Sequence, residues 1–233
     1  MSFFPSRHRC CPQCLERRRV IKGKEVIEYY HAGVVFYLVG LRAAIPLDVE
    51  MLRPAEGELT AAYRLLPRVV ESYGRFFQAV LGDGLYFNAP FFNLCLGLGK
   101  DVITVLKDEG RVLFQDAQGV FSLTAPQVWE EANQKIRAGD AAGFTSAEGI
   151  EVPLRVLRTE EVITRRHHRK DGWIMEKETH HWEWVTTLPA ARLSTRLLWQ
   201  IGHGRWEIEN DLFHTLVPYW FLDRCFRYES NVI

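Results

Sequence analysis

A strand, helix and strand pattern in residues 78–107 constrains the fold of this chain more than any other feature. QAVLGD is a short apolar run that ends at Asp83, and DVITVLK is a second run of the same kind. Between them, APFFNLCLGLG has a proline near its start and glycines at its end, which is typical of a helix. Because 47% of the 233 residues are hydrophobic, the chain can bury a sizeable core around this unit.

The residues before this unit predict two more strands and a helix. EVIEYYHAGVVFYLVGLRAAIPLDVEML is rich in Val, Ile, Tyr and Leu, which indicates two strands joined near residues 40–42. Apolar side chains in residues 58–73 recur at helical spacing, with Pro67, a residue that kinks or ends helices, among them. The order of elements up to residue 106 is therefore β, β, α, β, α, β.

The middle of the chain changes character. RVLF, VPLRVLR, EVITRR, GWIMEKE and HWEWVTTL are short strand patterns separated by charged turns, and KDGW is typical of a hairpin turn. Residues 107–190 are therefore expected to form a mainly β insertion. Residues 191–233 return to a helical pattern, which carries Glu209.

The formal net charge is zero, but basic residues gather in two places. Such clusters are often solvated loops, yet two on one chain favour contacts with a phosphate backbone. We therefore expect DNA contacts from these clusters; the candidate residues are Arg17, Arg18, Arg19, Arg165, Arg166, Arg169 and Lys170.

Three of the five cysteines, Cys10, Cys11 and Cys14, lie in one short stretch. No second CxxC or HxxxH pair follows at zinc-finger spacing. The pattern favours free thiols in a turn over a structural zinc site. The chain has no signal-peptide pattern and no apolar run long enough to span a membrane, so we expect a cytoplasmic protein without membrane contacts.

Two acidic residues are candidate ligands for a metal ion. Asp83 ends an apolar strand between two glycines, where a carboxylate has room to meet a ligand. Glu209 follows Arg205 by four residues, so both share one helix face, and the arginine can orient the glutamate or bind phosphate. Taken alone, the Asp-Gly dipeptide at Asp83 favours a simple turn, and the spacing of Arg205 and Glu209 favours an ordinary surface ion pair.

These motifs resemble a known family. FFPSRHRCCPQC, YYHAGVVFYLVG, IPLDVEMLRPAEGE, VLGDGLYFNAPFF, GKDVITVLKDE, HWEWVTTL and GHGRWEIEN span nearly the whole chain and are similar to DDE transposases of the bacterial insertion-sequence-four type. The resemblance implies a ribonuclease H-like mixed sheet flanked by helices. Residues 1–106 would form its first part, residues 107–190 its β-rich insertion and residues 191–233 its C-terminal helical part.

The resemblance also implies a site. Asp83 would be the second catalytic aspartate and Glu209 the catalytic glutamate, holding Mg²⁺ or Mn²⁺, and Arg205 would support phosphate binding. The implied reaction is hydrolysis and strand transfer at the ends of a DNA element. The implied partners are double-stranded DNA, at element ends and target, and a second copy of the chain in the DNA complex.

The family's first catalytic aspartate has no counterpart before Asp48. We therefore expect a domain truncated at both termini and inactive or impaired in catalysis, and Asp48 is a less favoured substitute for the first aspartate. Two alternatives stay open, a non-catalytic DNA-binding remnant and a zinc-stabilised interaction module built on Cys11 and Cys14.

Overall fold

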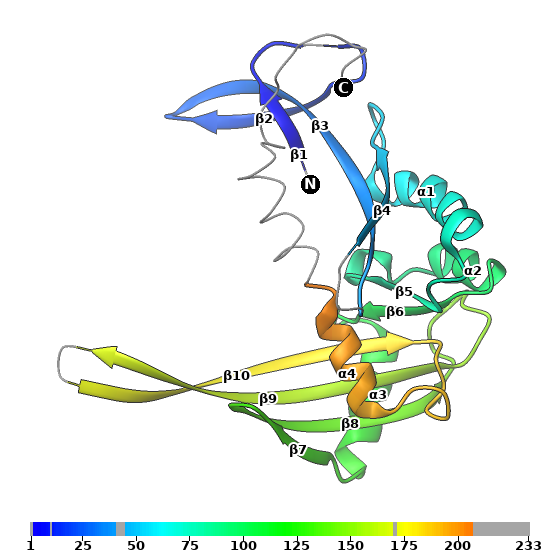
Figure 1. The fold of residues 1–233 in the computed structure, drawn as a ribbon, viewed down its shortest axis with the longest axis vertical. Helices are drawn as coiled ribbons and strands as arrows, with labels where there is room; N and C mark the ends of the chain where they lie inside the picture. The colour runs from blue at the N-terminus through cyan, green and yellow to red at the C-terminus, as the bar shows by residue number, and fades with distance from the viewer. Residues whose placement is uncertain (1, 10, 41–44, 170–171, 207–233) are drawn as a thin grey trace. The chain divides into compact units, whose positions relative to one another are not determined.

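The structure is a computed structural model that describes residues 2–9, 11–40, 45–169 and 172–206 (Figure 1). The described residues fall into two compact units. The first unit is formed by the chain up to Phe77, and the few described residues from Gly204 onward are grouped with it. The second unit is Gln78–His203.

The first unit is an antiparallel sheet with one helix. Its strands are β1 (Ser2–Ser6), β2 (Leu15–Ile21), β3 (Lys24–Leu38) and β4 (Ile45–Met51), and β3 pairs with each of the other three. Lys22 and Gly23 both have positive φ, 52° and 76°, as a tight two-residue hairpin turn requires. This turn fixes the β2–β3 register, in which Ile21 pairs with Lys24. The predicted pair of strands joined near residues 40–42 is confirmed, because Leu38 pairs with Ile45.

Helix α1 (Glu58–Tyr73) packs against β3 and β4. Its buried residues recur at helical spacing and are Ala61, Ala62, Leu65, Leu66 and Val69. The helix continues through Pro67 to Tyr73 and does not end early. The helix also carries Arg64 and Arg68, which form ion pairs with acidic residues of β4 and the following turn. The predicted helix over residues 58–73 is therefore confirmed.

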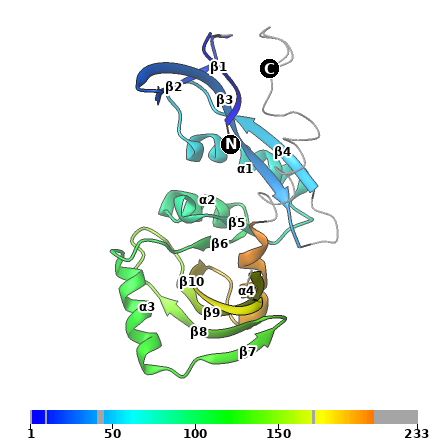
Figure 2. The same ribbon diagram turned by 90° about the vertical axis from the view of Figure 1, so that its left-hand side faces the viewer.

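The second unit is built on one sheet with strand order β5-β6-β10-β9-β8-β7 (Figure 2). Strands β5 (Ala79–Gly82) and β6 (Asp101–Val105) are parallel and are connected through the 3-10 turn η1 (Gly84–Tyr86) and helix α2 (Ala89–Gly97). The other pairs are antiparallel; these strands are β7 (Gln127–Glu131), β8 (Gln134–Phe144), β9 (Leu154–Arg169) and β10 (Gly172–Thr186). Because β10 pairs with β6, the strands after residue 107 extend the same sheet.

Helices α3 (Val112–Leu123) and α4 (Thr195–Gly204) cover opposite faces of this sheet (Figure 2). Leu157 and Trp184 face the core that contains Leu198 and Trp199 of α4. Their chain neighbours Arg158 and Glu183 point the other way, since side chains alternate along a strand, and both reach Gln118 of α3. Helices α3 and α4 thus shield opposite faces of the sheet, and α2 also packs against β6.

The described residues confirm a mixed α/β protein with two sheets and four α-helices. One predicted strand is wrong, because RVLF leads into and begins α3. VPLRVLR and EVITRR belong to the single strand β9, and GWIMEKE and HWEWVTTL to the single strand β10. Within the described residues, no helix combines the length and apolar character needed to cross a bilayer.

Candidate functional site

Asp83 lies directly after β5, at the carboxyl end of that strand. Its Oδ1 accepts a hydrogen bond of 2.8 Å from the backbone N–H of Leu85, the second residue of η1, so that Asp83 caps this turn. The side chain is half-buried. The space that the sequence predicts beside Gly82 is filled by the chain itself, since a Cβ at Gly82 would lie 2.8 Å from the Cβ of Tyr86. Gly82 therefore serves packing and does not make room for a ligand.

Glu209, the second predicted carboxylate, lies outside the described residues. Arg205 follows α4 directly, and its guanidinium carbon is 5.8 Å from the centre of the Trp206 ring. The structure thus describes Asp83 and Arg205 but not the predicted pairing of Asp83 with Glu209.

Asp48, the less favoured third carboxylate, is held by Arg68 of α1. Its Oδ2 accepts a hydrogen bond of 2.6 Å from Arg68 Nε, and Arg68 also contacts Glu50 at 2.8 Å. The hydrogen bond from Arg68 holds the pKa of Asp48 below its ordinary value, against the opposing effect of burial. This carboxylate joins β4 to α1, which gives it a structural role.

The first basic cluster lies on β2 and faces acidic residues of β3. Arg17 contacts Glu28 at 2.6 Å and stacks over the Tyr30 ring. Arg18 reaches Glu25 at 3.5 Å, and Arg19 reaches Glu28 at 3.5 Å. All three predicted DNA-contacting arginines here have an acidic partner across the hairpin, so much of their charge is balanced locally.

The second basic cluster lies on an extension of the β9–β10 hairpin. Within the described residues, β9 beyond Thr164 pairs only with β10, and Figure 1 shows this two-stranded segment reaching past the rest of the sheet. We call residues 165–169 and 172–176 the β arm. Arg165 lies 3.6 Å from Glu178, and Arg166 stacks on Trp173, which is 59% exposed. Arg169 ends β9, and Lys170 lies outside the described residues.

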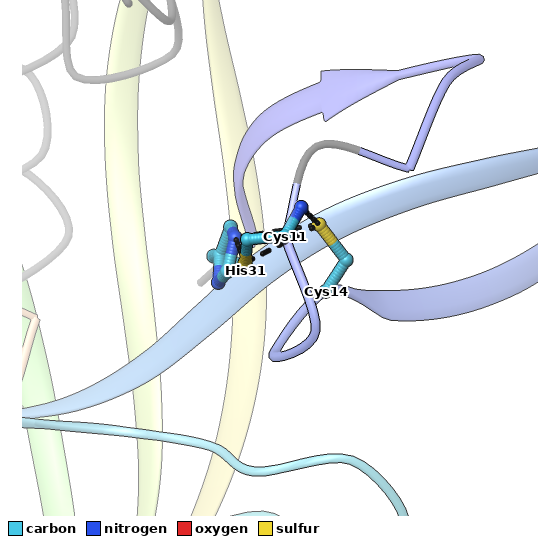
Figure 3. Close-up of side chains that lie close together, drawn as sticks. All are labelled: Cys11, Cys14 and His31. Carbon is cyan, nitrogen blue, oxygen red and sulfur yellow. Dashed lines mark hydrogen bonds between the residues drawn. The ribbon is translucent and has the colours of Figure 1, made fainter. Parts of the chain in front are cut away.

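Cys11, Cys14 and His31 form a cluster that the sequence predicted only in part (Figure 3). The two sulfur atoms are 3.7 Å apart, and His31 Nε2 lies 3.5 Å from Cys11 Sγ and 3.6 Å from Cys14 Sγ. All three residues are buried. Burial lowers the pKa of His31 and raises the pKa of the Cys11 thiol. His31 was missed because it follows Cys14 at no recognised ligand spacing and lies within an apolar strand.

Two buried acids in the second unit have contrasting surroundings. Glu161 Oε1 accepts hydrogen bonds from Thr159 and Trp199, both 2.7 Å, and lies 2.9 Å from His203 Nε2. Glu183 Oε2 has no hydrogen-bond partner within the described residues. The first acid is well satisfied and joins α4 to the sheet, whereas the second is poorly satisfied.

No protein-family model and no curated protein matches this sequence. The assignment of function therefore depends on the residues and geometry given above.

Proposed function

We propose that this chain is a DDE-type DNA strand-transferase domain with a ribonuclease H-like core, in which Asp83 and Glu209 bind Mg²⁺ or Mn²⁺. The observation that carries this proposal is the position of Asp83 at the carboxyl end of β5. In α/β sheets, ligands bind beside the carboxyl ends of the strands, where connecting loops leave functional groups accessible.

The surroundings of Asp83 suit a hard divalent cation. One carboxylate oxygen is fixed by the N–H of Leu85, which orients the group, and the other makes no hydrogen bond or salt bridge within the described part of the chain. Carboxylate oxygens are the ligands that Mg²⁺ and Mn²⁺ prefer. The resemblance supplies Glu209 as the second carboxylate and Arg205 as the group that binds phosphate.

The β arm supports a role in DNA binding. Arg165 and Arg166 lie on its first strand, and the exposed Trp173 and Met175 lie on the second. A two-stranded ribbon with basic and flat aromatic side chains can meet both the phosphates and the grooves or unstacked bases of DNA. The arm is therefore the part of the second unit best suited to hold DNA.

The chemistry implied is hydrolysis of a phosphodiester bond by water, which frees a 3′-hydroxyl, and attack of that hydroxyl on a target phosphate, which displaces the 3′-oxygen of the target strand. Bound divalent ions polarise the attacking oxygen and stabilise the leaving oxygen. Asp83 and Glu209 would position those ions, and Arg205 would neutralise charge on the phosphate.

The test is nicking of supercoiled plasmid DNA by the full chain in Mn²⁺, with and without Asp83→Asn. We expect nicking by the wild type to be weak at most, because the sequence offers no counterpart of the family's first catalytic aspartate, and to be lost in the variant, because an amide oxygen is a neutral and weaker ligand than a carboxylate. Asp108→Asn is the matched control: Asp108 is also a turn aspartate of the second unit, and it accepts a hydrogen bond of 3.0 Å from the N–H of Gly110.

The other outcomes separate the alternatives. Salt-sensitive DNA binding without nicking would replace the proposal with a non-catalytic DNA-binding domain. Absence of both DNA binding and nicking would contradict a role in transposition. Nicking that persists in Asp83→Asn would remove Asp83 from the site.

A further inference from the structure

The distances within the Cys11, Cys14 and His31 cluster match those of a tetrahedral metal site. A zinc ion with Zn–S bonds of about 2.3 Å and a Zn–N bond of about 2.0–2.1 Å separates its sulfur ligands by about 3.8 Å and sulfur from nitrogen by about 3.5 Å. The corresponding distances here are 3.7 Å, 3.5 Å and 3.6 Å. The sulfur atoms are too far apart for a disulfide, which needs about 2.05 Å.

The backbone explains why these three side chains meet. A turn in which Cys14 N–H donates to Cys11 O at 3.2 Å places the two thiols on one side. Cys11 N–H also donates to Cys14 Sγ at 3.4 Å, which would stabilise a thiolate there. Strand β2 begins at Leu15, which pairs with Tyr30, so His31 lies beside Cys14 in the register of β2 and β3. The hairpin thus brings together ligands that are far apart in sequence.

We propose that Cys11, Cys14 and His31 bind one zinc ion in tetrahedral geometry. Thiolate and imidazole ligands favour zinc over the hard cations assigned to Asp83, so this site is independent of the proposed strand-transfer site. Three protein ligands in the described chain leave one coordination position. A cavity of about 270 Å³, lined by Cys11, His31 and residues 50–53, adjoins two of the three ligands and has room for water molecules. The ion would tie the N-terminal turn to β3.

Cobalt substitution of the full chain tests this site. The purified protein, stripped with a chelator and titrated with Co²⁺, should bind one equivalent in a tetrahedral site, with intense visible absorption and a thiolate-to-cobalt charge-transfer band. Zn²⁺ should displace it and abolish both. Cobalt bound by carboxylates such as Asp83 would be octahedral and would absorb only weakly. Each of Cys11→Ser, Cys14→Ser and His31→Asn should weaken cobalt binding by more than about 100-fold. Loss of a residue that only hydrogen-bonds to a metal ligand already lowers metal affinity by about 10- to 100-fold.

Three matched variants should bind cobalt at the Cys11, Cys14 and His31 site as the wild type does. Cys95→Ala removes a buried cysteine from α2, His181→Asn removes an exposed histidine from β10, and Asp83→Asn removes the proposed magnesium ligand. Loss of the tetrahedral cobalt signal in Asp83→Asn, absence of that signal in the wild type, or a tetrahedral signal that survives both cysteine substitutions would overturn the proposal. Because the nicking assay is read separately, failure of one proposal leaves the other standing.

Circular dichroism of each ligand variant without metal separates loss of a ligand from loss of folding. We expect these variants to retain the secondary structure of the metal-free wild type while failing to bind cobalt. If cobalt binding in His31→Asn equals that of the wild type in a folded variant, the site does not include His31 and the proposed geometry is wrong.

Discussion

Asp140→Ala is expected to lower the free energy of unfolding by about 3–5 kcal/mol, the usual cost of removing one partner from a buried ion pair. Arg155 is 2% exposed, and its guanidinium donates hydrogen bonds of 2.8 Å and 2.5 Å to the two carboxylate oxygens of Asp140. The same guanidinium donates to Leu193 O at 2.6 Å, and Thr195 donates to Asp140 at 2.6 Å. The pair therefore joins β8 and β9 to the start of α4, and removal of Asp140 leaves a cation buried without its anion.

Urea unfolding of the full chain measures this effect, and the same two strands provide the control. Arg137 and Glu160 form a cross-strand pair at 3.6 Å, with side chains 54% and 41% exposed. Glu160→Ala should change stability by less than about 1 kcal/mol. Adding Arg155→Met to Asp140→Ala should recover part of the lost free energy of unfolding, because it removes the buried guanidinium that has no anion beside it. Equal effects of Asp140→Ala and Glu160→Ala would contradict the structural account of this pair.

Glu183→Gln is expected to stabilise the protein at alkaline pH and to have little effect in acid. Burial raises the pKa of Glu183 to about 7, Arg158 opposes this rise and Glu109 adds to it. Because the folded-state pKa is raised, the contribution of neutral Glu183 to stability is fully present below the ordinary pKa of 4.5. This contribution is lost as the pH rises through about 7. Above about pH 7, ionisation of Glu183 lowers the stability of the folded state by up to about 3 kcal/mol. The neutral amide of Glu183→Gln avoids this cost.

The measurement is urea unfolding of the wild type and Glu183→Gln at about pH 5 and about pH 8. Glu161→Gln serves as a control whose expected effect on the free energy of unfolding has the opposite sign. Burial acts to raise the pKa of Glu161, but the contacts with His203, Thr159 and Trp199 lower it overall. Glu161→Gln should therefore destabilise at neutral pH, with a penalty that shrinks as the pH falls below the ordinary glutamate range. A Glu183→Gln effect that is the same at both pH values would contradict the assigned pKa.

Local patterns in the sequence were sufficient to predict α1, α2, β5 and β6, because apolar spacing and flanking glycine or proline define each of them. Helix α3 was missed, since its apolar residues were interpreted as a strand and Gly119 lowers helix propensity. Strands β9 and β10 were divided at residues 159–160 and 179–180, where polar side chains interrupt the apolar pattern although the strands continue. The pairing of β6 with β10, which joins residues about 80 positions apart, has no local signal.

The candidate sites were predictable to differing degrees. The turn that holds Cys11 and Cys14 was recognised, but His31 required the register of β2 and β3. Asp83 lies at the end of its strand as predicted, whereas the room expected beside Gly82 is taken by Tyr86. The arginines of β2 have acidic partners on β3 that only strand pairing could identify. Sequence patterns thus indicate which side chains are of a ligand-binding type, but not the contacts that form between strands.

The central claim, that Asp83 and Glu209 share one divalent cation site, is tested most directly by Mn²⁺ binding to the full chain on DNA, measured by electron paramagnetic resonance. A Cys11→Ser and Cys14→Ser background excludes the thiolate site. The account predicts that Asp83→Asn and Glu209→Gln each weaken Mn²⁺ binding by at least about tenfold, and that the double variant is little worse than either, because both carboxylates serve the same ions. Wild-type Mn²⁺ affinity in Asp83→Asn, or losses that simply add in the double variant, would contradict it.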